Sequence, residues 1–114
     1  VLLDMIARRG MTLTAIESGQ DGLLMRKIPQ SASIPGLDPA ALMDALRAAR
    51  AGSGANLALG VSVYMDERAA EMAMITPKGE KTHRITYGGP PRSLPRWSMN
   101  LALNWLRMTL EEMD

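Results

Sequence analysis

The chain has 114 residues, 46% of them hydrophobic, and its 13 basic residues nearly balance its 12 acidic ones. This length and apolar content predict one domain spanning residues 1–114 with a buried core, and the scattered charge gives no basic stripe, so we expect no nucleic-acid partner. The absence of cysteine excludes disulfides and thiolate metal sites, and no apolar run reaches the ~20 residues of a membrane-spanning helix, so we expect no membrane partner.

The first half of the chain alternates between helical and extended patterns. It predicts, in order, a helix over residues 1–9, a strand over 11–17, a tight connection over 18–22, a helix over 23–28, a loop over 29–36 and a helix between 38 and 52. Gly10 is expected to stop the first helix. For the third helix, Asp38 is expected to be the cap, Pro39 the first residue, and Gly52 the residue just past the end.

The second half predicts three strands and a long helix. The nearly apolar segment 55–64 is typical of a strand in the centre of a sheet. Segments 70–76 and 81–87, joined by Pro77-Lys78-Gly79, are expected to form a β-hairpin. The last helix is expected from residue 94 or 95 to 111, with an apolar face that repeats every three or four residues. The order α-β-α-α-β-β-β-α indicates a three-layer-like α/β domain whose mixed sheet has about four strands flanked by helices.

A turn over residues 17–22, Glu-Ser-Gly-Gln-Asp-Gly, joins the first strand to the second helix. Free N–H groups at a helix N-terminus suit a phosphate or a carboxylate ligand. The structural alternative is that Ser18 or Asp21 caps the helix and that the glycines permit a tight turn. Asp21 favours this alternative, because its carboxylate would occupy the positive end of the helix.

Several segments resemble, in the right order, motifs of the CinA C-terminal family, which includes nicotinamide-nucleotide amidohydrolases. Residues 13–24 (LTAIESGQDGLL) are similar to the family's signature A-E-S-C-T-G-G, and residues 28–33 (IPQSAS) to the following V-P-G-S-S. Residues 53–62 (SGANLALGVS) resemble its G-A-D-x-A-L-A-V-T strand, residues 73–87 its hairpin and residues 102–106 its final helix. The resemblance implies the family's α/β fold over most of the chain.

The family's enzymes convert nicotinamide mononucleotide into the acid and ammonia. The resemblance places Ser18 in the signature and Ser62 at the position of the Thr that ends the central strand, so it implies that these are the candidate catalytic residues. The ligand-binding candidates that it implies are Glu17, Gly19 and Gly22 of the signature and Arg92, which lies close to the family's Arg before the last helix.

The chain also departs from the family pattern. Between Ser33 and Asp38 it lacks the family's second strand and the Y-S-N-x-x-K segment, so the reactive-site Tyr and Lys have no counterpart. A serine hydroxyl is a poor nucleophile unless a base activates it. We therefore expect a shortened, degenerate and non-catalytic member that acts as a small oligomeric or partner-binding module. The alternative is a residual amidohydrolase or nucleotide-binding protein.

The remaining expectations concern location, metals and partners. His83 is the only histidine and lies in a predicted strand, where a surface or half-buried position is expected, and neither a metal site nor a cofactor is predicted. The N-terminal residues lack the pattern of a signal peptide, which favours a cytoplasmic location. Losing a strand would leave a sheet edge that needs cover, so we expect a homo-oligomer, with a full-length CinA-like protein as another possible partner.

Overall fold

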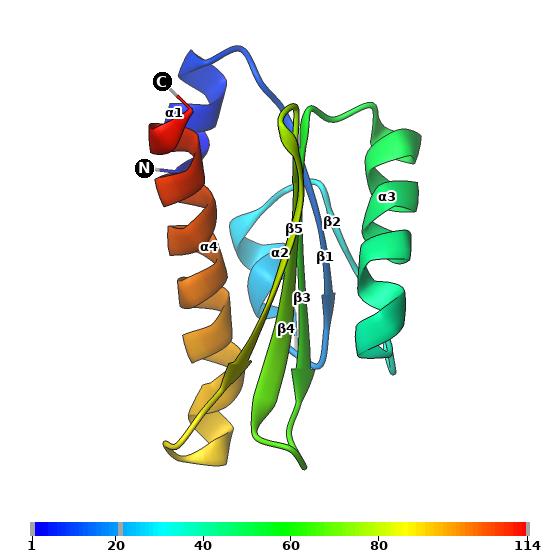
Figure 1. Ribbon diagram of the computed structural model, residues 1–114, viewed down its shortest axis with the longest axis vertical. Coiled ribbons are helices and arrows are strands. Elements are labelled where there is room, and N and C mark those ends of the chain that lie inside the picture. The colour runs from blue at the N-terminus through cyan, green and yellow to red at the C-terminus, as the bar shows by residue number, and fades with distance from the viewer. Residues whose placement is uncertain (1, 21, 114) are drawn as a thin grey trace.

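Figure 1 shows a computed structural model that describes residues 2–20 and 22–113. The described residues form four α-helices: α1 (Leu2–Arg8), α2 (Leu23–Lys27), α3 (Leu42–Ser53) and α4 (Leu94–Glu112). A single 3-10 turn precedes each of the two longer helices, η1 (Pro39–Ala41) before α3 and η2 (Pro91–Ser93) before α4. Within the described residues, no helix is both long and apolar enough to cross a membrane.

The strands form one mixed sheet in the order β2-β1-β3-β4-β5. They are β1 (Leu13–Ser18), β2 (Ser31–Ser33), β3 (Leu57–Tyr64), β4 (Ala69–Thr76) and β5 (Gly79–Thr86). Strand β1 runs parallel to both β2 and β3, whereas β3, β4 and β5 are successively antiparallel. The sheet is therefore parallel on one side of β3 and a meander on the other.

Helices cover both faces of the sheet, as Figure 1 shows with α4 on one side and α3 on the other. Side chains that alternate along each strand separate into two cores. The larger core joins Leu59 and Met72 to Leu106 of α4, and the smaller joins Ile16 and Ala73 to Leu46 of α3. The three-layer α/β architecture predicted from the sequence is confirmed.

The sheet has five strands rather than about four. The additional strand is β2, which lies inside the segment 29–36 that was predicted to be a loop. Its three residues pair with β1, so that Ala15 lies opposite Ser31 and Glu17 opposite Ser33. A strand of three mostly exposed residues has no apolar alternation, which is why its sequence is typical of a loop.

The end of α3 also differs from the prediction. Gly52 lies inside the helix, and Gly54 ends it in the left-handed conformation, with φ of 71° and its N–H donating to Arg50 O at 2.9 Å. Both positions are glycine, but a glycine C-cap requires this backbone bond as well as the residue type. At the other end, Asp38 precedes η1 and its side chain makes no capping hydrogen bond.

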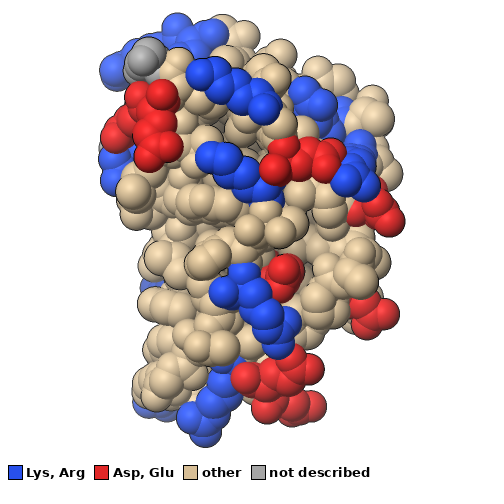
Figure 2. Space-filling view, viewed as in Figure 1, with Lys and Arg blue, Asp and Glu red and all other residues tan. Residues whose placement is uncertain are grey.

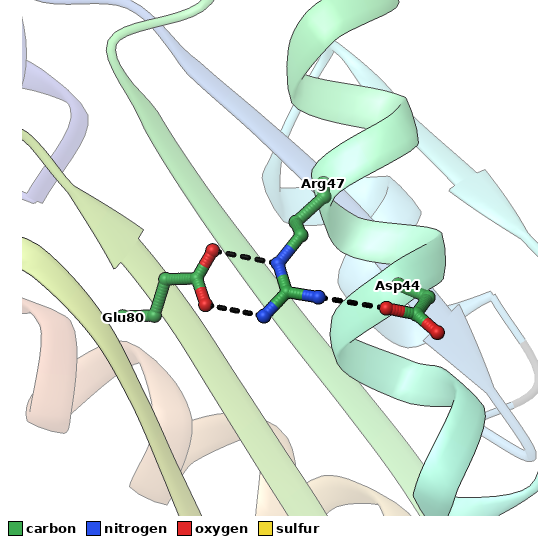
Figure 3. Close-up of polar contacts among 3 residues, drawn as sticks. All are labelled: Asp44, Arg47 and Glu80. Atoms are coloured by element: carbon green, nitrogen blue, oxygen red, sulfur yellow. Dashed lines mark hydrogen bonds and ion pairs between the residues drawn. The ribbon is translucent and has the colours of Figure 1, made fainter.

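An ion-pair network ties α3 to strand β5. Arg47 donates from Nε and Nη2 to the two carboxylate oxygens of Glu80, at 2.7 and 2.6 Å, and from Nη1 to Asp44 at 2.7 Å (Figure 3). The hydrogen bonds from Arg47 hold the pKa of the Glu80 carboxyl below its usual value. Because all three side chains are exposed, this network is a small contribution to stability that depends on salt and pH.

Candidate functional site

Ser18 and Ser62, the two candidate catalytic residues, lie side by side. Each is near the carboxyl end of its strand, and the parallel register of β1 and β3 places them directly opposite each other. Their exposed fractions are 4% and 0%. The carboxyl ends of parallel strands are where α/β proteins commonly bind ligands. The sequence-predicted pair is therefore brought together, but it is buried.

The backbone of Leu37 forms hydrogen bonds with the hydroxyl groups of both serines. Its N–H donates to Ser18 Oγ at 3.2 Å, and its carbonyl oxygen accepts from Ser62 Oγ at 3.2 Å. The same oxygen accepts a hydrogen bond from the Tyr64 hydroxyl at 3.0 Å. The segment that leads into α3 thus closes over the serines, and their hydroxyls contribute to holding it in place.

Tyr64 belongs to this cluster, although it was not among the residues predicted from the sequence. It lies two residues after Ser62 in β3, so both side chains point to the same face of the sheet. Burial raises the pKa of the Tyr64 phenol above its ordinary value. The phenol is therefore neutral near pH ~7 and acts as a hydrogen-bond donor rather than a base. The alternation of β3 was the signal that could have identified it.

Charged residues border the cluster on the side of the antiparallel strands. The Arg84 guanidinium lies 5.9 Å from the centre of the Tyr64 ring and forms ion pairs with Glu67 and Glu71. Its charge is therefore already matched by two carboxylates. The site combines hydroxyl groups with an arginine, but the hydroxyl groups bond the backbone of Leu37 and the arginine pairs with two carboxylates.

Glu17 points to the opposite face of the sheet from Ser18 and is fully buried. Its carboxylate accepts the backbone N–H of Gly22 at 2.8 Å and that of Leu24 at 3.0 Å. These bonds place a protein carboxylate at the start of α2, where an anionic ligand was one of the two expectations. Ser18, which was considered as the cap of this helix, bonds Leu37 instead. Asp21, the other capping candidate, lies outside the described residues.

The glycines of the turn have different surroundings. Gly19 has φ of 76°, and a Cβ there would lie 2.7 Å from the carbonyl oxygen of Val63. Gly22 has φ of 79° but open space around it. Between them, the buried Gln20 donates from Nε2 to Pro95 O at 3.1 Å and Ser98 Oγ at 2.9 Å. The turn is therefore packed against the end of β3 and tied to α4.

Arg92 lies away from the serine pair. It is exposed in η2, where it lines a cavity of about 480 Å³ with Ser93, Arg96, Trp97 and Asn100. Neither Ser18 nor Ser62 lines this cavity. The six sequence-predicted residues thus fall into three places: the serines under Leu37, the turn around the Glu17 carboxylate, and the surface beside α4.

The expected surface or half-buried position of His83 is confirmed. His83 is exposed in β5, and its ring centre lies 6.4 Å from that of Trp105. Across residues 2–20 and 22–113, no three His, Cys, Asp or Glu side chains gather as a group that could hold a metal ion.

Solved structures share this architecture. A CinA superfamily protein from Enterobacter cloacae aligns with a TM-score of 0.78 at 14% identity, covering 96% of this chain and 88% of that one. A competence or damage-inducible protein from Enterobacter asburiae aligns with a TM-score of 0.77 at 13% identity, covering 96% and 93%. The competence damage-inducible protein A from Klebsiella pneumoniae gives a TM-score of 0.72 at 19% identity, covering 99% and 97%.

The comparisons define the class of protein by its fold. No protein-family model matches the chain, and no curated protein matches its sequence. The structural likeness spans nearly the whole chain, so the chain has the fold of CinA superfamily proteins, as the sequence motifs implied.

Proposed function

We propose that this chain is a non-catalytic CinA-like protein that works in the cytoplasm as a small self-associating module. The observation that carries the proposal is the bonding of Ser18 and Ser62 to the backbone of Leu37. Both hydroxyls are buried, so a substrate could reach them only after the segment over them has moved. The proposed cytoplasmic location is supported by the absence of cysteine, which is typical of proteins from reducing compartments.

The chemistry of the cluster supports the loss of catalysis. Amide hydrolysis requires a base that activates the nucleophile and donors that stabilise the oxyanion. Among the described residues, the hydrogen-bond partner of Ser18 Oγ is the backbone N–H of Leu37, which cannot accept its proton. Tyr64 has a raised pKa and its hydroxyl donates a hydrogen bond to Leu37 O, so it is not poised as a base.

The assay is ammonia release from nicotinamide mononucleotide. We expect the wild-type protein and Ser18→Ala to release no more ammonia than a buffer blank, and the nucleotide to leave the melting temperature unchanged. The proposal would be overturned by ammonia release from the wild-type protein that Ser18→Ala abolishes. Using Ser18→Ala as the control separates turnover at this site from a contaminating amidase.

A residual amidohydrolase or nucleotide-binding protein is the competing function. It is favoured by the adjacency of Ser18 and Ser62 at the carboxyl ends of two parallel strands. It would require the Leu37 segment to release both hydroxyls. The same assay decides between the two functions, because only this one predicts turnover or a nucleotide-dependent thermal shift.

Self-association is supported by strand β5. Seven of its eight residues are exposed, with Ile85 the buried exception. An uncovered edge strand presents free backbone N–H and C=O groups to any other strand that approaches. Sedimentation velocity at micromolar concentration is expected to show a species heavier than the monomer. A clean monomer would contradict this half of the proposal and would leave docking on a full-length CinA-like protein as the remaining module function.

A further inference from the structure

Strand β5 is one of the two edges of the sheet, and most of its residues are exposed. Figure 1 shows β5 in the foreground between α4 and α3, and no described element lies beyond it. The other edge strand, β2, has only three residues, whereas β5 has eight. In Figure 2, which shows this face, basic and acidic side chains alternate along it rather than forming a patch of one sign.

The hairpin geometry determines which residues of β5 direct their backbone groups outward. Thr76 and Gly79 are paired across the two-residue turn, and residues flanking such a turn form a hydrogen-bonded pair. Alternation then assigns Lys81, His83 and Ile85 to bonds with β4. The N–H of Tyr87 continues this series, because it donates to Arg68 O at 2.8 Å. The backbone groups that face away from β4 are those of Glu80, Thr82, Arg84 and Thr86.

We propose that two copies of the chain pair β5 against β5, antiparallel, about a two-fold axis through Thr82, so that the two five-stranded sheets become continuous. The inference rests on the self-association in the proposed function and names its surface and its partner, a second copy. Because the axis passes through Thr82, Thr82 faces Thr82 of the second copy, and every other residue faces the one that lies equally far from Thr82 in the opposite direction along the strand.

Charge complementarity selects this register. With the axis at Thr82, Glu80 of each copy lies opposite Arg84 of the other, which gives two pairs of opposite charge and a central Thr–Thr pair. An axis at Lys81, Glu80 or Arg84 would instead place a like-charged residue opposite itself. An axis at His83 would place Arg84 opposite Thr82 and lose both charge pairs. Among the registers centred on residues 80–84, the Thr82 register alone forms opposite-charge pairs.

The pairs across the axis extend the networks within each copy. Glu80 already accepts two bonds from Arg47, and Arg84 donates to Glu67. A carboxylate has about four acceptor positions and a guanidinium has five N–H donors, so both groups retain capacity for a further partner. Pairing therefore does not require the existing ion pairs to break.

The first experiment compares Thr82→Lys with Thr82→Val by sedimentation velocity at equal micromolar concentrations. Lysine would place two like charges directly opposite each other at the axis, whereas valine keeps a β-branched side chain that pairs well across strands. We expect wild type and Thr82→Val to sediment at twice the monomer mass and Thr82→Lys to sediment as a monomer. Circular dichroism and urea unfolding of each variant check that the fold is intact.

The second experiment uses the absence of cysteine in the chain. A hydrogen-bonded antiparallel pair separates its Cα atoms by about 5.5 Å, which lies within the range that a disulfide can bridge. Under mild oxidation, Thr82→Cys is expected to form a covalent dimer at least tenfold faster than the matched control His83→Cys, which faces Lys81 of the second copy. In strong denaturant, the two rates are expected to become equal.

The outcomes separate this inference from the proposed function. If the wild-type protein is oligomeric but Thr82→Lys remains so, or the two cysteine variants cross-link at equal rates, the β5 pairing is wrong while self-association stands. If the wild type is a monomer, both fail. Ammonia release that depends on Ser18 would overturn the proposed loss of catalysis but would have no bearing on the β5 pairing.

Discussion

Glu17 is a buried carboxylate that two backbone N–H groups of the α2 turn use as their acceptor. In Glu17→Gln, one of the two oxygens becomes an NH₂ group that can only donate, so one N–H loses its acceptor. We expect the free energy of unfolding in urea to fall by about 1–3 kcal/mol. Glu112→Gln, an exposed control, is expected to change it by less than about 0.5 kcal/mol. Equal stability of the two variants would show that the Glu17 bonds contribute little.

Gly19 and Gly22 form a matched pair of residues with nearly the same positive φ but different space around them. In Gly22→Ala, only the left-handed backbone is unfavourable, which costs about 1–2 kcal/mol. Gly19→Ala adds a contact with Val63 O, so we expect a further loss of about 1–3 kcal/mol. Thermal and urea unfolding of both variants measures the difference, and a zero difference would mean that the end of β3 yields to the new methyl group.

At the scale of elements, α4 depends on its buried face. Leu106 has no exposed surface and packs in the larger core, whereas Met108, two residues along the helix, is 47% exposed. Leu106→Ala is expected to reduce the free energy of unfolding by about 2–5 kcal/mol. Met108→Ala is expected to change it by less than about 0.5 kcal/mol. A similar loss in both variants would contradict the packing of α4 described above.

The link between α3 and β5 is expected to depend on pH. Because Arg47 lowers the pKa of Glu80 in the folded protein, the pair stabilises the fold above the ordinary pKa of a glutamate. That contribution is lost as the pH falls through the lowered pKa. In the Thr82→Lys background, where no second copy faces Glu80, Glu80→Gln should lower the melting temperature slightly near pH ~7, and this difference should disappear once the pH is below the lowered pKa of Glu80. A difference that persists in acid would exclude the ion pair as its cause.

Longer elements could be predicted from the sequence because their periodic patterns extend over many residues. The apolar repeat of α4 extends over several helical turns, and the apolar run of β3 extends over eight residues. Both elements are present in the structure where the sequence predicts them. Strand β2 was missed because three residues cannot show a period. The end of α3 was misplaced because Gly52 and Gly54 differ in backbone conformation, which residue type alone does not encode.

The candidate site was predictable in part. The resemblance identified Ser18 and Ser62 as the candidate catalytic residues, and the register puts them opposite each other on neighbouring strands. The role of Leu37 could not be predicted, because its bonds to the serines use backbone atoms that every residue has. The same holds for Glu17, whose bonding partners are the N–H groups of Gly22 and Leu24. Which backbone group a side chain bonds depends on the tertiary fold. Sequence patterns therefore identify the candidate side chains but not their hydrogen-bond partners.

At the scale of the whole molecule, the chain has the fold of CinA superfamily proteins, and the backbone of Leu37 closes over its hydroxyl pair. A crystal structure of the protein soaked with nicotinamide mononucleotide tests this account most directly. We predict that both serines remain bonded to Leu37, with no nucleotide against them. Nucleotide density in contact with Ser18 and Ser62, with the Leu37 segment displaced, would contradict it.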